Sequence, residues 1–168
     1  MNLYIIVNSL FAMIHKIIQK VKHKTTMKPK LINQQSGRDA LYNDQRIVDF
    51  LHTHLENYGD PKEDIQMCLD YVHNRGGFVL LGIIDDEIIG AVVINETGMS
   101  KFIPENILVY IAMDKKYRGQ GYGKELMSNA LKLCKGDVAL HVEQENPAKF
   151  LYEKLGFTNK YLEMRLKR

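Results

Sequence analysis

The spacing of apolar residues divides most of the chain into helical and extended segments. Apolar positions recur every three or four residues in 44–55 and again in 60–76, and this spacing predicts two amphipathic helices. Nearly continuous apolar runs at 78–84 and 88–95 follow, separated by acidic residues, and they predict a buried β-hairpin. Two helices therefore precede the first paired strands.

The second predicted helix has a strong start signal. Asp60 stands at the N-cap position, Pro61 in the first turn, and Glu63 where a capping box places its acid. A capping carboxylate satisfies backbone N–H groups that have no intrahelical partner. We therefore expect the Asp60 side chain to cap this helix.

Strands and helices alternate through the second half of the chain. A polar loop that contains Gly98 and Pro104 follows the hairpin, and short apolar runs then alternate with helical spacing. The last segment alternates apolar and charged residues, as a half-buried strand does. The expected elements are strands at 107–113, 138–143 and 161–167, with helices at 121–135 and from Asn146-Pro147 to Gly156.

Residues 1–29 differ from the rest and predict a basic amphipathic extension ahead of a domain at 30–168. Residues 1–30 hold six lysines and no acid, and their apolar residues follow helical spacing. Polar residues interrupt the apolar run, which is too short to span a bilayer, and no signal-peptide cleavage site follows it. Three roles stay open: a dispensable extension with Met27 as an alternative start, a membrane-surface helix, or a partner-docking helix.

The bulk composition fits one globular domain. The chain has 168 residues, of which 45% are hydrophobic and 26% charged, and its net charge is +3. Setting aside the six lysines of the first 30 residues leaves 17 basic against 20 acidic residues, a net charge of about −3. Such a body does not favour nucleic-acid binding, which usually needs a basic face.

The cysteines and histidines predict neither a disulfide nor a metal site. Cys68 and Cys134 are far apart and fall within helical patterns, which is typical of reduced, buried thiols in an intracellular protein. The six histidines show no ligand spacing, because His52 and His54 point to different sides of their helix. We therefore expect a cytoplasmic protein with no bound metal.

A glycine-rich turn follows the strand expected at 107–113 and opens the next helix. Free backbone N–H groups and the positive end of a helix dipole converge on an anion at such a turn, and glycine lets the backbone approach closely. The segment therefore predicts a phosphate site. Its sequence is Arg118-Gly119-Gln120-Gly121-Tyr122-Gly123.

Two common phosphate loops do not fit this turn. In a Walker loop the first glycine would fall on Arg118 and the hydroxyl residue on Glu125. In a dinucleotide fingerprint the third glycine would fall on Lys124, and no second strand-helix-strand unit follows. The turn is therefore neither a nucleoside triphosphate loop nor a Rossmann site.

The remaining pattern, Arg-x-x-Gly-x-Gly at the start of a helix, resembles the acetyl-CoA pyrophosphate loop of the GNAT superfamily of N-acetyltransferases. Asn146, Ala148 and residues 151–157 resemble the second cofactor segment of that superfamily. The resemblance covers roughly residues 30–168 and adds a first strand near 30–34. It implies an α/β (α+β) GNAT fold, with a mixed sheet of about six to seven strands, helices on both faces, and splayed parallel strands at the CoA site.

The resemblance also implies the donor and its contacts. Acetyl-CoA would be the acyl donor, with pantetheine bound to the β-strand backbone and the pyrophosphate bound to amides of the glycine turn. A backbone N–H near Met113 would stabilise the negative charge that develops on the carbonyl oxygen. The implied binding residues are Ile111, Ala112, Met113, Arg118, Gly119, Gln120, Gly121, Tyr122, Gly123, Lys124 and Asn146.

Two further residues are candidates for proton transfer. Tyr152 stands where the family places the acid that protonates the leaving thiolate, although its helical spacing also fits a core tyrosine. Strand alternation turns Glu143 away from apolar neighbours, which makes it the first candidate for the base that accepts the amine proton. Glu96 and Glu105 come next, and for each glutamate an ordinary solvated side chain stays an alternative.

These features favour an acetyl-CoA-dependent N-acetyltransferase in which the primary amine of a small metabolite or a protein attacks the thioester directly. The alternative is a catalytically inactive, acyl-CoA-binding regulatory module. The resemblance places the acceptor pocket near Asn57, Tyr58, Asp60 and the loop at 96–106, a polar set that would tolerate a cation. The last strand leaves room for a homodimer.

Overall fold

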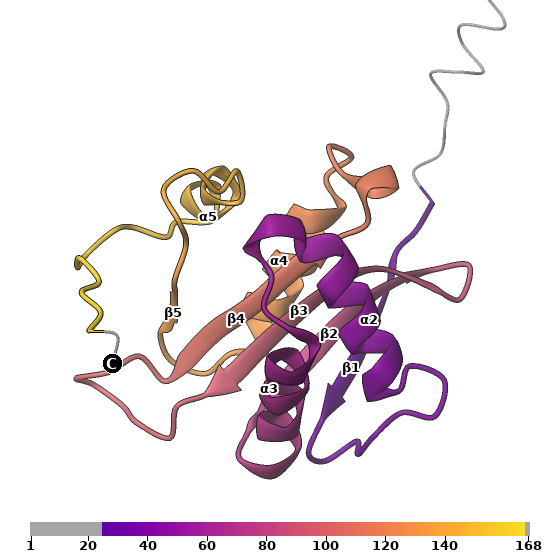
Figure 1. Ribbon diagram of the computed structural model, residues 1–168, viewed down its shortest axis with the longest axis horizontal. Helices are drawn as coiled ribbons and strands as arrows, with labels where there is room; N and C mark the ends of the chain where they lie inside the picture. The colour runs from indigo at the N-terminus through magenta and orange to yellow at the C-terminus, as the bar shows by residue number, and fades with distance from the viewer. Residues whose placement is uncertain (1–24, 167–168) are drawn as a thin grey trace, which may run out of the picture.

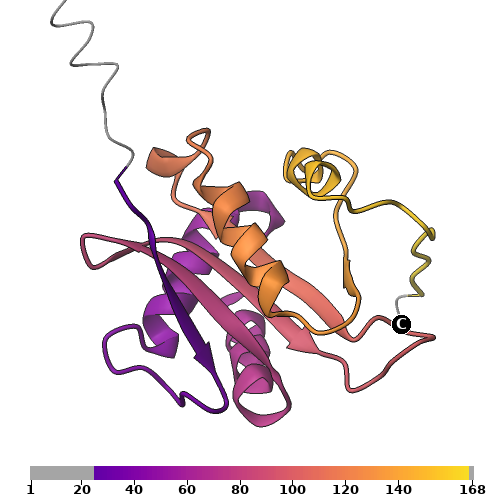
Figure 2. The same ribbon diagram turned by 180° about the vertical axis from the view of Figure 1, so that it is seen from behind.

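The computed structural model describes residues 25–166, which form a five-stranded sheet with helices on both faces (Figures 1 and 2). The strands lie in chain order across the sheet, and only the last pair, β4 with β5, is parallel. The strands are β1 (Lys28–Asn33), β2 (Gly77–Ile84), β3 (Glu87–Glu96), β4 (Asn106–Met113) and β5 (Val138–Leu140).

Each face of the sheet has its own hydrophobic cluster. Helices α2 and α3 cover one cluster and α4 covers the other, so the expected α/β fold with helices on both faces is confirmed. The described residues form five strands rather than the expected six to seven. The helices are α2 (Asp44–Leu55), α3 (Lys62–Asn74), α4 (Tyr122–Leu133) and α5 (Lys149–Lys154), with 3-10 turns η1 (Glu56–Tyr58) and η2 (Lys115–Tyr117).

The predicted hairpin is present as β2 and β3. Asp85 and Asp86 connect the strands with φ angles of 50° and 61°. Positive φ at both central residues is typical of the tight turn that matches the twist of paired strands. The acidic residues between the two apolar runs thus mark the turn as expected.

An extra residue in β4 changes which face its side chains occupy. Val93 pairs with Tyr110 and Ile94 pairs with Leu108, so Val109 is inserted as a β-bulge. Residues two apart in a regular strand share a face. Here Leu108 packs in the cluster under α4, whereas Tyr110 packs in the cluster under α2 and α3.

The bulge also explains why the expected helix cap is wrong. Helix α3 has Pro61 as its N-cap residue, and no side chain caps it. Instead, the Asp60 carboxylate accepts a hydrogen bond of 2.7 Å from the Tyr110 hydroxyl. A buried phenol needs an acceptor, and the bulge turns Tyr110 toward the connection that carries Asp60.

The final strand expected at 161–167 is wrong for the residues that the structure describes. Residues 161–166 belong to no sheet, and Leu162, Met164 and Leu166 are 88%, 94% and 81% exposed. The strand expected at 138–143 is reduced to the three residues of β5, which leaves too short an edge to pair with a further strand. The expected homodimer therefore lacks the strand on which it would rest.

Most of the expected N-terminal extension lies outside the described residues, and so does its amphipathic pattern. Within the described part, Met27 is 4% exposed, and the Tyr122 hydroxyl donates to the Thr25 carbonyl oxygen at 2.8 Å. The packed chain therefore includes residues just ahead of position 30. No helix between residues 25 and 166 is long and apolar enough to cross a membrane.

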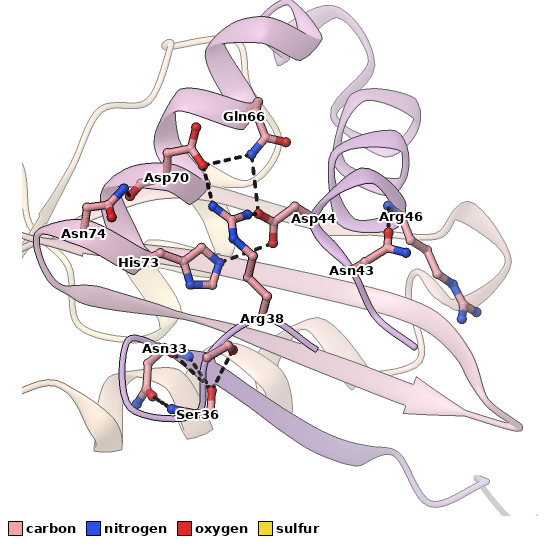
Figure 3. Close-up of polar contacts among 11 residues, drawn as sticks. Asn33, Ser36, Arg38, Asn43, Asp44, Arg46, Gln66, Asp70, His73 and Asn74 are labelled. Carbon is pink, nitrogen blue, oxygen red and sulfur yellow. Dashed lines mark hydrogen bonds and ion pairs between the residues drawn. The ribbon is translucent and has the colours of Figure 1, made fainter. Parts of the chain in front are cut away.

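A polar cluster joins the β1–α2 connection to both helices on that face (Figure 3). Arg38 pairs with Asp44 at the start of α2 and lies 2.9 Å from Asp70 Oδ1 on α3. His73 Nε2 lies 3.3 Å from Asp44 Oδ1, and Gln66 donates to both carboxylates. Burial lowers the pKa of His73 and favours its neutral form.

This cluster makes Asp44 more important to stability than an exposed acid on the same helix. Asp44→Asn should lower the free energy of unfolding by about 1 to 3 kcal/mol, since its side chain is only 11% exposed and Arg38 would lose one of its two carboxylate partners. Asp49 pairs with Lys62 but its side chain is 49% exposed, so Asp49→Asn should change stability by about 0.5 kcal/mol at most. Urea denaturation of both variants tests the difference, and equal losses would contradict it.

Candidate functional site

The parallel pairing of β4 with β5 ends early. Only Asn106–Leu108 pairs with Val138–Leu140, and the chain then turns away from β4 toward α5 (Figure 1). In the described part of the chain, residues 110–113 pair with β3 on one edge, and residues 109–113 pair with no strand on the other. We call residues 109–113 the splayed segment. Its second edge presents backbone N–H and C=O groups that a ligand can bind.

Three of the expected donor contacts lie within the splayed segment. Ala112 is buried in the cluster under α2 and α3, whereas Ile111 and Met113 pack against the cluster under α4. Their side chains therefore hold β4 between two packed layers. This placement leaves the backbone edge as the part that faces the divergence from β5, so the role of these residues as backbone contacts stays a prediction that fits the geometry.

The glycine turn lies at the end of β4 and begins α4. Gly119 and Gly121 have φ angles of 72° and 85°, which side-chain-bearing residues rarely adopt. The first intrahelical bond runs from the Glu125 N–H to the Gly121 carbonyl oxygen at 3.1 Å. The N–H groups of Gly123 and Lys124 therefore have no acceptor within the helix.

The surroundings of this turn suit an anion. A Cβ atom added at Gly119 would meet no heavy atom within 4 Å, so the backbone is open on that side. Lys115, Lys116 and Lys124 flank the turn, and the positive end of the α4 dipole points toward it. These features fit the pyrophosphate of a CoA molecule.

The Arg118 side chain, in contrast, points away from this open side. Its Nε donates to the Met113 carbonyl oxygen at 2.9 Å and its Nη2 to the His54 carbonyl oxygen at 2.8 Å. Its Nη1 lies 2.8 Å from Glu56 Oε1. The guanidinium is thus neither directed at the anion site nor simply solvated, and it ties the turn to the end of α2.

The ring of Tyr152 lies in the hydrophobic cluster under α4. It is 8% exposed and packs edge-on against Phe157, with ring centroids 5.9 Å apart. Burial raises the pKa of Tyr152 to about 12, so the phenol keeps its proton at neutral pH. Within residues 25–166, its hydroxyl donates no hydrogen bond to another residue.

Tyr122, Asn146 and Gln120 are held by contacts of their own. The Tyr122 ring is 2% exposed and its hydroxyl bonds Thr25, so Tyr122 can reach an anion only through its backbone. Asn146 Oδ1 accepts from the Ala148 N–H at 2.9 Å and fixes the turn before α5. Gln120 Nε2 donates to the Lys116 carbonyl oxygen at 2.7 Å and braces the glycine turn.

The candidate bases differ in their surroundings. Glu143 is exposed and lies beyond the end of β5, so the strand alternation that favoured it does not extend to its position. Glu105 Oε2 accepts from the Asp137 N–H at 2.8 Å, which lowers the pKa of that carboxyl and makes it a weaker base. Glu96 is exposed at the end of β3. Among the described residues, no hydrogen bond or ion pair joins any of the three to Tyr152.

Several polar contacts on the α2 and α3 side could not be found from local patterns. The Tyr58 hydroxyl donates to the Glu145 carbonyl oxygen at 3.3 Å. Burial, with the Asp60 hydrogen bond, raises the pKa of Tyr110 far above its usual range. Asn95 Nδ2 lies 3.4 Å from Cys68 Sγ, and its buried Oδ1 has no partner within the described residues. These contacts join residues that are far apart in the sequence, beside the splayed segment.

Between residues 25 and 166, no three histidine, cysteine or acidic side chains gather in a metal-binding arrangement. The two cysteines are free, and burial raises the pKa of each thiol to about 11.

Comparison with known proteins agrees with this geometry. The sequence model of the acetyltransferase (GNAT) family matches residues 40–157, which include α2, the splayed segment, the glycine turn and α5. N-alpha-acetyltransferase 30 of Xenopus laevis is 32% identical over 92 residues, a match that covers 52% of this chain and 34% of that protein. The Homo sapiens protein of the same name matches equally over 25% of its length. The match thus spans about a third of the length of the Xenopus laevis protein and a quarter of the length of the Homo sapiens protein.

Solved structures share the fold at lower identity. The aminoglycoside N-acetyltransferase AAC(6')-Iy, solved with CoA, superposes with a TM-score of 0.64 at 14% identity, covering 88% of this chain and 98% of that one. Ribosomal-protein-alanine N-acetyltransferase from Brucella melitensis biovar Abortus 2308 gives 0.58 at 15% identity, covering 85% and 100%. At these identities the likeness shows a common fold.

The two glycines at the start of α4 should respond oppositely to alanine. Gly121→Ala should lower the free energy of unfolding by about 1 to 2 kcal/mol, because alanine is strained at a φ of 85°. Gly123 is helical, and an added Cβ would make only an ordinary 3.4 Å contact with Met113, so Gly123→Ala should raise it by about 0.5 to 1 kcal/mol. Urea denaturation measures both, and a loss at position 123 as large as that at 121 would refute the conformational explanation.

Proposed function

Because this chain belongs to the GNAT acetyltransferase family, we propose that it transfers an acetyl group from acetyl-CoA to the primary amine of an acceptor. The observation that carries the proposal is the early divergence of β4 from β5 next to a glycine turn that opens α4. The splayed segment offers backbone groups to the pantetheine arm, and the turn offers amides to the pyrophosphate.

We further propose that the acceptor is the α-amino group of a protein or peptide. One observation supports this choice over a small metabolite. The relatives that match in sequence, at 32% identity over 92 residues, are named N-alpha-acetyltransferases. The aminoglycoside acetyltransferase resembles the chain at only 14% identity, which supports a shared fold rather than a shared acceptor.

The residues of this chain would divide the chemistry as follows. Amides of residues 118–124 hold the pyrophosphate, and backbone groups of Ile111, Ala112 and Met113 orient the thioester between β4 and β5. A backbone N–H near Met113 stabilises charge on the carbonyl oxygen as the amine nitrogen forms its bond to the carbonyl carbon. Asn146 supports the opposite side of this site through the turn before α5.

Three proton transfers complete the reaction. An alkylammonium must lose a proton before it can attack, and Glu143, directly or through water, is the proposed acceptor. When the carbon–sulfur bond breaks, the Tyr152 phenol, which burial keeps protonated at neutral pH, gives its proton to the thiolate. The nitrogen loses its second proton as the amide forms, and that proton returns through water to the Tyr152 oxygen.

A panel of amines tests the proposed acceptor against the alternatives. We expect free thiol release from acetyl-CoA with a short peptide that has a free N-terminus. The same peptide with an acetylated N-terminus and an internal lysine should give less than about a tenth of that rate. Turnover only with small amines would contradict the choice of acceptor. Tight acetyl-CoA binding with no turnover on any amine would favour the regulatory module.

Removal of the Tyr152 hydroxyl tests whether this phenol is the general acid. Tyr152→Phe should lower kcat by about 10²-fold or more while the Kd for acetyl-CoA stays within about threefold, because the phenyl ring keeps its packing and only the proton donor is lost. Tyr161→Phe makes the same exchange at a residue that is 78% exposed, and it should leave kcat unchanged. A normal kcat in Tyr152→Phe would show that Tyr152 is a core tyrosine only.

A further inference from the structure

The contacts of Arg118 connect three parts of the molecule at one guanidinium. Its three nitrogens reach the last residue of β4, the last turn of α2 through His54, and Glu56 at the start of η1. Arg118 itself belongs to the turn that offers amides to the donor. A planar fork of donors can hold three such partners at once, whereas a lysine ammonium has a single charged nitrogen.

Glu56 is the point at which η1 is held. It follows α2 with a φ of 57°, a conformation that non-glycine residues keep only when neighbouring contacts hold them there. Lys115 Nζ lies 3.3 Å from the same Oε1 that Arg118 contacts. Two cations of the β4–α4 connection therefore converge on one carboxylate of η1.

The other end of η1 contacts the opposite side of the divergence between β4 and β5. Tyr58 donates to the carbonyl oxygen of Glu145, which lies in the segment that leaves β5 for α5. Asp60 follows directly and bonds Tyr110 on the splayed segment. Residues 56–60 thus bridge the glycine turn and the segment after β5, on the side opposite α4.

We propose that Arg118 is a positioning residue for acetyl transfer, which holds Glu56–Tyr58 against the glycine turn so that a bound donor orders the side where the acceptor enters. This inference rests on the proposed function, because it takes CoA as the ligand of the turn. A group bound at amides 118–124 restrains the turn, and the Arg118 fork passes that restraint to η1. The coupling is reciprocal, so an ordered η1 also strengthens donor binding.

Hydrogen exchange of the full chain, followed by mass spectrometry with and without CoA, tests this coupling. In the unaltered chain, saturating CoA should slow exchange of the amides at 56–59 by about tenfold. In Arg118→Lys the slowing should fall below about twofold, and the Kd for CoA should rise by no more than about tenfold, which is the factor that loss of the coupling allows. In the acetyl-transfer assay, the KM for the acceptor should rise about tenfold with kcat within about threefold.

A second variant separates the contact from the turn. Glu56→Gln leaves the glycine turn untouched and removes only the carboxylate, so it should lose the slowing at 56–59 in the same way. Arg75→Lys, the same exchange at the far end of α3, is the control and should behave as the unaltered chain does. Slowing that persists in Glu56→Gln would overturn the inference even if Arg118→Lys did not fold.

The remaining outcomes are distinct. If Arg118→Lys weakens CoA binding more than about tenfold and keeps the slowing at saturation, Arg118 is a direct donor ligand and the inference is wrong. If the unaltered chain binds CoA without slower exchange at 56–59, the inference fails and the proposed function stands. If the unaltered chain does not bind CoA, both fail together.

Discussion

The early end of the pairing between β4 and β5 is the constraint on which the candidate site depends. A regular parallel pair that continued to Met113 would satisfy the backbone groups of both strands and leave none for a ligand. Instead, the bulge at Val109 follows the last paired residue of β4, and β5 ends at Leu140. The antiparallel pairing with β3 resumes beyond the bulge, so the sheet stays intact while one edge of β4 opens.

Backbone groups line one side of this opening, and side chains line the other. On the α4 side, the proposed binding groups are backbone amides, and the turn that carries them has glycine in the left-handed region at 119 and 121. On the side of α2 and α3, the geometry comes from side chains such as Tyr58, Tyr110 and Asp60. A site made of backbone groups depends on the path of the chain more than on the identity of its side chains.

The same distinction explains how much the sequence could predict. Helix α2, the β2–β3 hairpin and the glycine turn follow from local spacing and turn chemistry, and their positions were predicted closely. The prediction that Asp60 caps α3 was wrong, because the bulge turns Tyr110 toward Asp60 although the two residues are 50 positions apart in the sequence. The prediction of a final strand at 161–167 was wrong, because alternating apolar residues form a half-buried strand only beside a strand edge long enough to pair, and β5 has only three residues. The Arg118 fork could not be predicted either, since His54 and Glu56 meet it only in the folded chain.

The position of η1 links the donor side to the acceptor side. Acetyltransferases of one fold share a donor and differ in their acceptors, so the donor turn should stay constant while the facing segment varies. Residues 56–60 contact both the β4–α4 connection and the segment after β5, so a change in either contact moves the other side as well. Under the proposed function, acceptor preference depends on how η1 is held as well as on which side chains line the opening. A substitution that exchanged only the lining residues, without the ion pairs at Glu56, would place the new side chains on a displaced segment.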